Sequence, residues 1–305
     1  MKILVTGSTG FVGHWLVRDL QASGHLAVGT PPSAELDLLD RDAVAKLIER
    51  IRPDAVAHLA AVSYGPDARR DPDHAFAVNV AGTQALIAAI TAASPGAALL
   101  VAGSSEVYGH PRPQDLPLSE DAPTEPTQPY GLSKLAQERA ALTAADRYAL
   151  NVVVARSFNH TGPGQRPEFV APALAQRVLA ARAAGDREIP VGNVDVRRDL
   201  GDVRDVVRAY RLLLEGVAAG TIGSGSVVNV ATGRGVAIRE VLAILSRLAG
   251  VDAEPRVDAT LVRADDPPEI VGDASRLKAL TGWIPEIGLE QTLADLLASI
   301  EATPT

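Results

Sequence analysis

The chain has 305 residues, 47% of them hydrophobic and 22% charged, with a formal net charge of −8. This length supports one large or two closely packed domains with a substantial core, and the acidic balance without Lys/Arg runs argues against nucleic acid as a partner. The absence of cysteine excludes disulfides, thiolate nucleophiles and Cys-ligated metals, so the chemistry must rest on hydroxyls, carboxylates, amines or a cofactor.

The first segment, residues 1–13, carries one lysine and an apolar run of only three residues before glycines begin. Such a run is too short for the core of a signal peptide. Along the rest of the chain, no stretch approaches the eighteen or so apolar residues of a membrane span. We therefore expect a cytoplasmic protein with no membrane partner.

The first strand–turn–helix unit is a candidate dinucleotide site. Lys2–Thr6 predicts a strand, and Phe11 to Leu20 shows helical apolar spacing. The glycines at Gly7, Gly10 and Gly13 allow a tight turn and a close approach of the backbone to a pyrophosphate at the helix N-terminus. A P-loop is excluded, because His14-Trp15 stands where Lys-Ser/Thr would be needed.

The alternation of strand and helix continues along the chain. Short apolar strands that alternate with helices imply a parallel sheet covered on both faces, so we predict an α/β fold with a Rossmann-type doubly wound parallel sheet. The predicted strands are 25–29, 55–59, 97–102, 151–156 and 226–230, and the predicted helices are 41–51, 72–93, 129–148, 171–184, 203–215, 238–248 and 289–300.

The second strand ends in Thr30-Pro31-Pro32, where an acid would favour NAD and an arginine would accept the extra phosphate of NADP. Neither is present, so the sequence leaves the cofactor as NADP or NAD. Asp37 comes shortly after and could hydrogen-bond the adenine amino group. The alternative is an acid of ordinary use near a helix N-terminus.

A hydroxyl, a phenol and an ammonium form the candidate catalytic group. Tyr130 and Lys134 share one face of the predicted helix 129–148, which follows a loop with six prolines from Pro111 to Pro129. We expect the Lys134 cation to lower the pKa of the Tyr130 phenol toward working pH. Ser104 follows an apolar strand, at the carboxyl end where ligands bind in such folds.

Beyond Ser157 the pattern loosens into Gly/Pro-rich loops and scattered helices, which we interpret as a smaller C-terminal α/β substrate-binding lobe. We assign residues 1–157 plus about 199–231 to the dinucleotide-binding domain, and about 158–198 plus 232–305 to that lobe. The histidines show no metal-ligand spacing, so we expect no metal; they are His14, His25, His58, His74, His110 and His160.

Taken together, these motifs resemble the extended short-chain dehydrogenase/reductases that act on nucleotide sugars, over essentially the whole chain. The motifs are the three glycines, His58-Leu-Ala-Ala61, Asn79-Val-Ala-Gly-Thr83, Gly103-Ser-Ser-Glu-Val-Tyr-Gly109, and Tyr130 with Lys134. Within the family, the chain looks most like the GDP-4-keto-6-deoxy-D-mannose reductases, because of Arg156-Ser-Phe-Asn-His-Thr-Gly-Pro-Gly-Gln165, Val191-Gly-Asn193, and Arg198-Asp199 with Asp202-Val-Arg-Asp205.

The resemblance implies roles for individual residues. Ser104, Tyr130 and Lys134 would be the catalytic trio, with Glu106 as a carboxylate that a dehydratase would need. Cofactor contacts would come from Gly7, Thr9, Gly10, Phe11, Val12, Gly13, Asp37, Leu38, Leu59, Ala60, Ala61, Asn79, Tyr130 and Lys134. Substrate contacts would come from Ser105, Asn159, His160, Val170, Arg198, Arg263 and Asp266.

For four of these residues an ordinary structural role is the alternative. Asn159 and His160 could serve loop capping, and Arg198 and Arg263 could be ion-paired arginines. The family also suggests a homodimer formed by two helices from each subunit, which the alanine-rich segments 72–93 and 129–148 would suit.

Three functions remain open at this point. The leading one is NAD(P)H-dependent reduction of the C4 keto group of a nucleotide-linked 4-keto-6-deoxyhexose, from GDP-4-keto-6-deoxy-D-mannose to GDP-D-rhamnose. The second is a 4,6-dehydratase or epimerase of the same family. The dehydratases carry Gln-Asp inside the glycine turn, where this chain has Phe11-Val12, which favours the reductase. The third is a cofactor-sensing protein without turnover. The presence of Tyr130 and Lys134 at the spacing of a catalytic pair argues against it.

Overall fold

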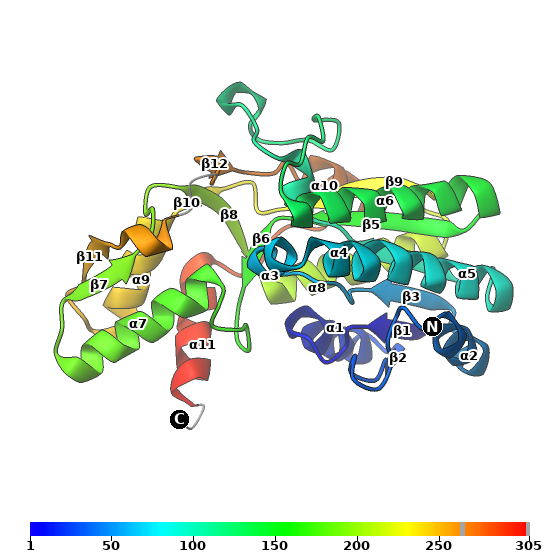
Figure 1. Cartoon of the computed structure of the whole chain (residues 1–305), viewed down its shortest axis with the longest axis horizontal. Helices are drawn as coiled ribbons and strands as arrows, with labels where there is room; N and C mark the ends of the chain where they lie inside the picture. The colour runs from blue at the N-terminus through cyan, green and yellow to red at the C-terminus, as the bar shows by residue number, and fades with distance from the viewer. Residues whose placement is uncertain (263–265, 303–305) are drawn as a thin grey trace.

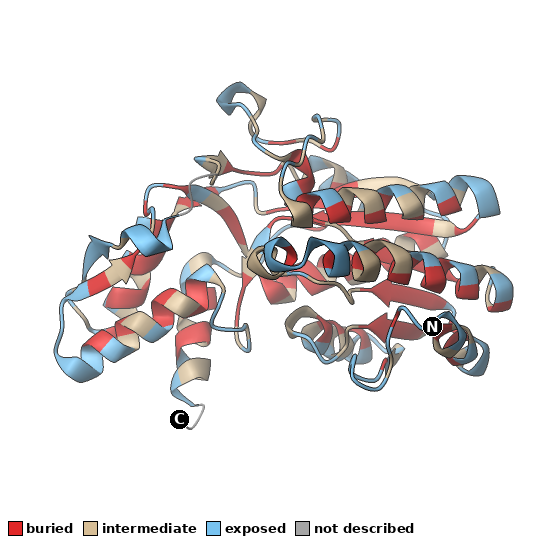
Figure 2. Ribbon diagram, viewed as in Figure 1, coloured by how far each residue is buried: buried red, intermediate tan, exposed pale blue. Residues whose placement is uncertain are grey.

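A computed structural model, which describes residues 1–262 and 266–302, contains the predicted parallel sheet at its centre. Its order is β2-β1-β3-β4-β5-β9 and every neighbouring pair is parallel. The central strands are buried on both faces, as Figure 2 shows, which explains their continuous apolar sequences. The strands are β1 (Lys2–Thr6), β2 (Leu26–Gly29), β3 (Ala55–His58), β4 (Ala98–Ala102), β5 (Asn151–Ser157) and β9 (Ser226–Val230).

Helices cover both faces of this sheet, so the doubly wound fold is confirmed. On one face, α1 (Phe11–Ala22) and α8 (Val203–Ala218) pack on the sheet around Leu16, Leu20 and Leu213. On the other face lie α2 (Arg41–Ile51), α5 (Thr83–Ala93) and α6 (Pro129–Tyr148). The helix starts follow local rules: the Asp40 carboxylate accepts from Ala43 N at 3.0 Å at the start of α2.

The predicted helix 72–93 is continuous but contains a π-helical turn. It consists of α4 (Pro72–Phe76), the π turn η1 (Ala77–Gly82) and α5, and α3 (Gly65–Arg70) precedes it. By length and composition it could cross a membrane, so the expectation that no stretch approaches a span is wrong. Alanine raises the mean hydropathy here without a run of large side chains. The segment packs as a core helix, with Leu86 and Ile90 buried against the sheet.

A second, smaller lobe lies beside the carboxyl ends of the sheet (Figure 1). Its core joins α7, α9 and α11 around residues such as Leu174, Leu242 and Leu293. Its strands are short, with two to six residues each, and sequence periodicity did not predict them. The elements are β6 (Asn159–Thr161), β7 (Glu188–Val191), β8 (Arg197–Asp202), β10 (Gly235–Ala237), β11 (Glu254–Val257), β12 (Glu269–Ile270), α7 (Val170–Ala184), α9 (Ile238–Ala249), α11 (Leu289–Glu301) and the 3-10 turn η4 (Ala259–Leu261).

Two of the predicted boundaries differ from the observed packing. Strand β8 pairs with β10, β12 and β6, so the chain returns to the main domain at Val203 rather than at 199. The sequence predicts residues 232–305 in the smaller lobe, but Leu277 of α10 (Ser275–Thr281) and Trp283 after it are buried in the core of the main domain. Both segments connect the two lobes, so a boundary placed at one position of the sequence does not describe them.

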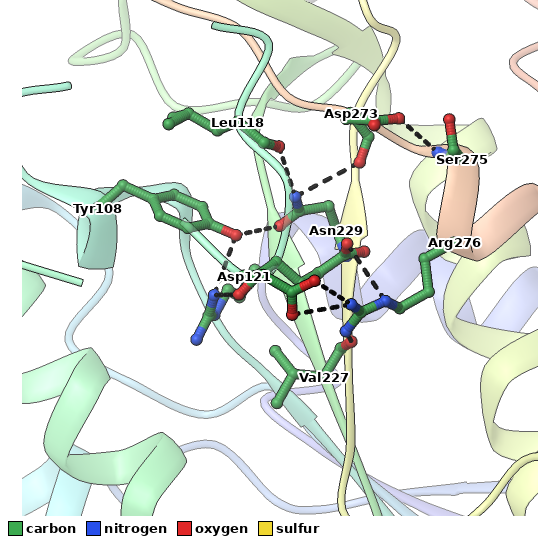
Figure 3. Close-up of polar contacts among 10 residues, drawn as sticks. Tyr108, Leu118, Asp121, Val227, Asn229, Asp273, Ser275 and Arg276 are labelled. Carbon is green, nitrogen blue, oxygen red and sulfur yellow. Dashed lines mark hydrogen bonds and ion pairs between the residues drawn. The ribbon is translucent and has the colours of Figure 1, made fainter. Parts of the chain in front are cut away.

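The proline-rich loop is anchored to the main domain by buried polar contacts. It leaves the 3-10 turn η2 (Ser105–Tyr108), includes the 3-10 turn η3 (Pro113–Asp115), and forms a bridge between Leu118 and Gly272. Figure 3 shows Asn229 of β9 at the centre of these contacts. The Asn229 amide accepts from Tyr108 Oη at 2.7 Å and donates to Leu118 O at 2.9 Å.

Candidate active site

The turn between β1 and α1 is an open cradle for a phosphate. Gly7 has φ +69°, and a Cβ on Gly13 would lie 2.1 Å from Gly7 O. The N-cap residue of α1 is Gly10, which offers no side chain to cap the helix. The N–H groups at the start of α1 are therefore available to an anion, as a dinucleotide pyrophosphate requires. Thr9 is exposed and Val12 is partly buried at the same turn.

The loop after β3 lies directly against this turn. A Cβ on Gly7 would approach Ala60 N to 2.9 Å, and the backbone N–H groups of Leu59 and Ala60 each donate to Thr6 Oγ1 at 3.2 Å. Ala61 continues the same loop and is partly buried. The structure thus brings together the glycine turn and the predicted cofactor residues of segment 59–61.

The end of β2 carries no charged group in its Thr30-Pro31-Pro32 sequence. The Ser8 hydroxyl donates to Thr30 O at 2.9 Å and fixes this end of the strand against the glycine turn. Asp37 is exposed, and its carboxylate accepts from Leu39 N at 2.9 Å. Leu38 is buried, where a Cβ on Gly82 would approach it to 3.0 Å.

The candidate catalytic trio, Ser104, Tyr130 and Lys134, is assembled by two closely packed elements. Ser104 ends the segment after β4 and caps η2 by accepting from Glu106 N at 3.2 Å. Gly131, in the first turn of α6, is packed so closely that a Cβ would lie 2.6 Å from Glu106 O. This contact brings the Tyr130 phenol into hydrogen bonding with the Ser104 hydroxyl. Ser105 is buried beside Ser104, and Glu106 is exposed.

The pKa of Tyr130 moves in the opposite direction to the expected one. Burial of the phenol raises its pKa, and the negative charge of Glu106 raises it further, while the hydrogen bond with Ser104 lowers it. The Lys134 ammonium donates instead to Ala102 O at 2.5 Å and to Gln137 Oε1. Tyr130 is therefore held as a neutral phenol at neutral pH, which suits a proton donor.

Burial acts on Lys134 as well, but favours its uncharged form. The side chain is only 3% exposed, and desolvation lowers the pKa of its ammonium to about 7, against a smaller raising effect of Glu138. Burial thus favours the uncharged forms of both Tyr130 and Lys134, which lie one helical turn apart. A lysine that titrates near neutral pH is typical of a functional site.

Asn79 lies behind the trio, and its amide is committed to protein groups. It donates to Val62 O at 3.1 Å and to Ser133 Oγ at 2.9 Å, and it accepts from Val62 N at 2.8 Å. The Ser133 hydroxyl in turn donates to Tyr130 O at 2.8 Å. Both amide donors of Asn79 are thus used inside the protein, and its predicted contact with a cofactor stays a prediction.

Three buried residues near the trio were missed as site residues by sequence reasoning. Gln137, Thr83 and His58 form hydrogen bonds that lead from Lys134 to β1, through Thr83 Oγ1 at 2.8 Å from both Gln137 Nε2 and His58 Nε2. Thr83 and His58 lie in motifs that the sequence singled out, but nothing in the spacing indicated that they meet. Gln137 carried no signal beyond its place one turn after Lys134.

The predicted substrate residues lie where the smaller lobe meets the main domain. The His160 ring stacks on Phe11 of the glycine turn, with centroids 6.2 Å apart and planes 13° apart, and its Nδ1 donates to Phe158 O at 3.0 Å. Burial lowers the pKa of His160, so its imidazole is neutral. Asn159 is exposed at the start of β6, and Val170 is exposed at the start of α7.

Arg198 and Asp266, both predicted substrate contacts, form an ion pair with each other. Arg198 also donates to Pro267 O at 2.8 Å. Arg198 thus fixes the segment before β12, as the ion-paired alternative predicts. The expected contribution of Arg263 lies outside the described residues. Within residues 1–262 and 266–302, no group of His, Asp and Glu side chains could hold a metal ion.

A doubly wound sheet with an uncapped glycine turn and a Ser–Tyr–Lys trio at its carboxyl edge defines a dinucleotide-dependent oxidoreductase of the short-chain type. The NAD dependent epimerase/dehydratase family model matches residues 3–231. The chain belongs to this family, and is accordingly an NAD(P)-dependent enzyme.

Individual relatives match the chain over its full length. It is 36% identical over 303 residues to GDP-6-deoxy-D-mannose reductase from Pseudomonas aeruginosa, covering 99% of this chain and 97% of the relative. The structure of RMD from Pseudomonas aeruginosa complexed with NADPH superposes with a TM-score of 0.89 at 35% identity, covering 99% of both chains. The Thermus thermophilus UDP-glucose 4-epimerase complex with NAD gives 0.86 at 28% identity, covering 100% of both chains.

Proposed function

We propose that this chain uses NAD(P)H to reduce the C4 keto group of a nucleotide-linked 4-keto-6-deoxyhexose, converting GDP-4-keto-6-deoxy-D-mannose to GDP-D-rhamnose. The observation that carries the substrate assignment is the full-length likeness to the Pseudomonas aeruginosa reductase, at 36% identity. The geometry of the trio supports the reaction class, because a neutral phenol bonded to a serine hydroxyl is ready to give a proton.

The residues that would hold the cofactor are those of the glycine turn, the 59–61 loop and Lys134. The uncapped N-terminus of α1 fits a pyrophosphate, and neither a side chain nor a Cβ fills the cradle. Bound NAD(P)H supplies the hydride that adds to the sugar carbon. The end of β2 offers no group that discriminates the two cofactors, and structures similar to this chain hold NADPH and NAD, so both remain candidates.

The chain itself supplies the proton and stabilises the developing charge. Tyr130 gives its phenolic proton to the C4 oxygen, so the carbonyl becomes an alcohol. The Ser104 hydroxyl hydrogen-bonds the same oxygen as negative charge develops on it. The positive charge of Lys134, one helical turn away, stabilises the phenolate that remains until solvent returns a proton.

A nucleotide-sugar 4,6-dehydratase or epimerase is the second candidate. The observation that favours it is the position of Glu106, an exposed carboxylate close enough to Tyr130 to raise the pKa of the phenol. A dehydratase needs such a base for the C5 proton. UDP-glucose 4-epimerase from Azospirillum brasilense is also 28% identical over 313 residues.

We also propose a cytoplasmic homodimer in which the main domain, residues 1–157 and about 203–231, binds the cofactor and the smaller lobe binds the nucleotide sugar. Phe76 of α4, with Leu132 and Tyr148 of α6, are exposed apolar side chains on the two helices expected at the dimer interface. A symmetric contact would cover them. Neither nucleic acid nor a membrane is part of the proposed function.

The test is to incubate purified protein with a panel of nucleotide sugars, with and without NAD(P)H, and to measure product masses. Gain of two hydrogens on the GDP-linked 4-keto-6-deoxymannose, with stoichiometric consumption of NAD(P)H, is the expected result. Loss of water from GDP-mannose without added reductant would overturn the proposal in favour of a dehydratase. An unchanged mass with a new sugar spectrum would identify an epimerase.

A further inference from the structure

A continuous chain of buried hydrogen bonds connects the Lys134 ammonium to the end of β1. Lys134 Nζ donates to Gln137 Oε1, and Gln137 Nε2 donates to Thr83 Oγ1 at 2.8 Å. His58 Nε2 lies 2.8 Å from the same hydroxyl, and His58 Nδ1 lies 2.8 Å from Thr6 Oγ1. All five side chains are at most 3% exposed. This series of hydrogen bonds connects α6, α5, β3 and β1.

The donor and the acceptor of every hydrogen bond in this series are determined. Thr83 donates its hydroxyl proton to Asn79 O at 2.7 Å, so toward Gln137 and His58 it can only accept. His58 must therefore carry its proton on Nε2, and Nδ1 accepts from the Thr6 hydroxyl. Thr6 Oγ1 in turn accepts the N–H groups of Leu59 and Ala60 in the loop beside the glycine turn. A flipped Gln137 amide would place two donors against Lys134.

The surroundings leave Lys134 dependent on neutral acceptors. The titratable groups near it are Glu138 and Tyr130 on its own helix, His58 on β3, and Glu106 beside Tyr130. Glu138 is engaged by Arg156 in a buried ion pair at 2.7 Å. Burial lowers the pKa of His58 to about 3, so its imidazole is neutral. The Ala102 carbonyl and the Gln137 amide are the two acceptors bonded to the ammonium.

We infer that Gln137 is a positioning residue that fixes the Lys134 ammonium. Through Thr83 and His58, it also connects the ammonium by hydrogen bonds to Thr6, beside the glycine turn. The two acceptors take two of the three ammonium protons and hold the nitrogen at one place on the site side of α6. Gln137 does not touch the reacting atoms. It acts through Lys134, and only the kinetic arm of its test rests on the proposed function.

The first arm of the test measures the titration of Lys134 in the unliganded protein. The chain has only four lysines, at positions 2, 46, 134 and 278, so lysine enriched with carbon-13 at Cε gives four signals. The Lys134→Arg variant assigns the signal of interest. In Gln137→Leu we expect the Lys134 midpoint to fall by about one pH unit, because a hydrogen bond to the charged form is lost. In Gln137→Glu we expect it to rise by about one unit or more, because a carboxylate favours the ammonium.

The second arm measures turnover of the same variants. Gln137→Leu should lower kcat about tenfold while KM for the nucleotide sugar stays within about twofold, which is the pattern for loss of an interaction that acts in the chemical step. Thr83→Val removes the central hydroxyl of the chain and should lower kcat in the same sense. Gln291→Leu, a substitution of an exposed glutamine on α11, is the matched control and should leave both arms unchanged.

A Lys134 midpoint in Gln137→Leu within about 0.2 pH units of the wild type would overturn the inference, whatever the enzyme's substrate. If Gln137→Leu does not fold, the same criterion is applied to two other variants. The Lys134 midpoint should fall in Gln137→Met and rise in Gln137→Glu. If the midpoint moves as expected but the wild type turns over no 4-keto sugar, the proposed function fails and the inference stands.

Discussion

Tyr130 and Lys134 show how burial acts on an acid and a base that lie on one helix face. Desolvation disfavours the charged form of each, so it raises the pKa of the phenol and lowers that of the ammonium to about 7. Sequence spacing predicted that the two side chains are neighbours. It could not show that both are desolvated. A neutral phenol is the form that a ketone reduction consumes.

Replacement of Tyr130 by phenylalanine removes the proton donor and little else. We expect Tyr130→Phe to lower kcat by roughly 10²–10⁴-fold, because general acid catalysis is lost, with cofactor affinity nearly unchanged. The measurement is steady-state reduction with a parallel cofactor titration. Tyr148→Phe, on the exposed end of the same helix, is the control and should keep wild-type turnover. Wild-type turnover in Tyr130→Phe would show that the catalytic assignment is wrong.

Glu106 separates the reductase from the dehydratase. In a reduction it has no obligatory proton to move, so Glu106→Gln should retain at least about a tenth of the activity, a barrier change within roughly 1.4 kcal/mol. In a dehydratase the same change should abolish elimination. The assay monitors NAD(P)H consumption and product mass in parallel, with Glu290→Gln on α11 as the surface control.

At the scale of elements, one buried amide connects three segments around the proline-rich loop. Asn229 N donates to Glu120 Oε1 at 2.8 Å, and the Asn229 side chain bonds Tyr108 of η2 and Leu118 of the loop. Arg276 of α10 forms an ion pair with Asp121 at 3.0 Å on the same side (Figure 3). These contacts hold η2 in place, and η2 begins at Ser105, next to Ser104 of the candidate catalytic trio.

Loss of the Asn229 side chain should therefore destabilise the fold. Asn229→Ala leaves the buried Tyr108 hydroxyl and Leu118 carbonyl without this partner, and we expect a loss of about 2–4 kcal/mol in the free energy of unfolding. Urea titration monitored by far-UV circular dichroism measures it. Asn193→Ala, at an exposed turn, should stay within about 0.5 kcal/mol of the wild type. Equal stability of the two variants would contradict the anchoring role of Asn229.

The residues at the end of the edge strand β2 bear on the choice between NADH and NADPH. An acid at this position would repel the 2′-phosphate of NADP and an arginine would attract it, but the segment reads Thr30-Pro31-Pro32. We expect the kcat/KM values for NADH and NADPH to differ by less than about a hundredfold, which corresponds to roughly 2.7 kcal/mol. A larger ratio would show that a discriminating group reaches the 2′ position from elsewhere in the chain.

At the scale of the whole molecule, the buried His58 couples folding to pH. Its pKa is about 3 in the folded protein and 6.5 in the unfolded chain, so below pH 6.5 the unfolded chain binds more protons. Stability must then fall as pH drops from 6.5 toward 3. Lys134 contributes in a separate window, between its folded pKa of about 7 and its ordinary value of 10.5, where stability rises with pH.

The variant His58→Asn tests this coupling. It should lower the Tm at pH 7, because the bonds to Thr6 and Thr83 are altered, but its Tm should fall less than that of the wild type between pH 7 and 5. Thermal scans in buffers of constant ionic strength measure both slopes, and the exposed His74→Asn is the control. A slope as steep as that of the wild type would show that another group carries the dependence.

The sequence by itself determined the alternating strands and helices of the main domain, the glycine turn and the positions of Ser104, Tyr130 and Lys134. These features depend on apolar periodicity, on backbone freedom at glycine and on spacing within one helix, which are local properties. The strands of the smaller lobe escaped prediction because β8, Arg197–Asp202, has no apolar alternation. Its polar side chains are satisfied by distant partners, such as Glu269 at 3.0 Å from Arg197.

Only the tertiary structure decided the direction of the Tyr130 pKa, the pairing of Arg198 with Asp266, and the place of Gln137 in the site. Gln137 meets Thr83 across 54 positions of sequence, and Thr83 meets His58 across 25. Desolvation and buried hydrogen bonds depend on every group that packs around an atom. Those groups come from separate elements whose contacts exist only after the chain has folded.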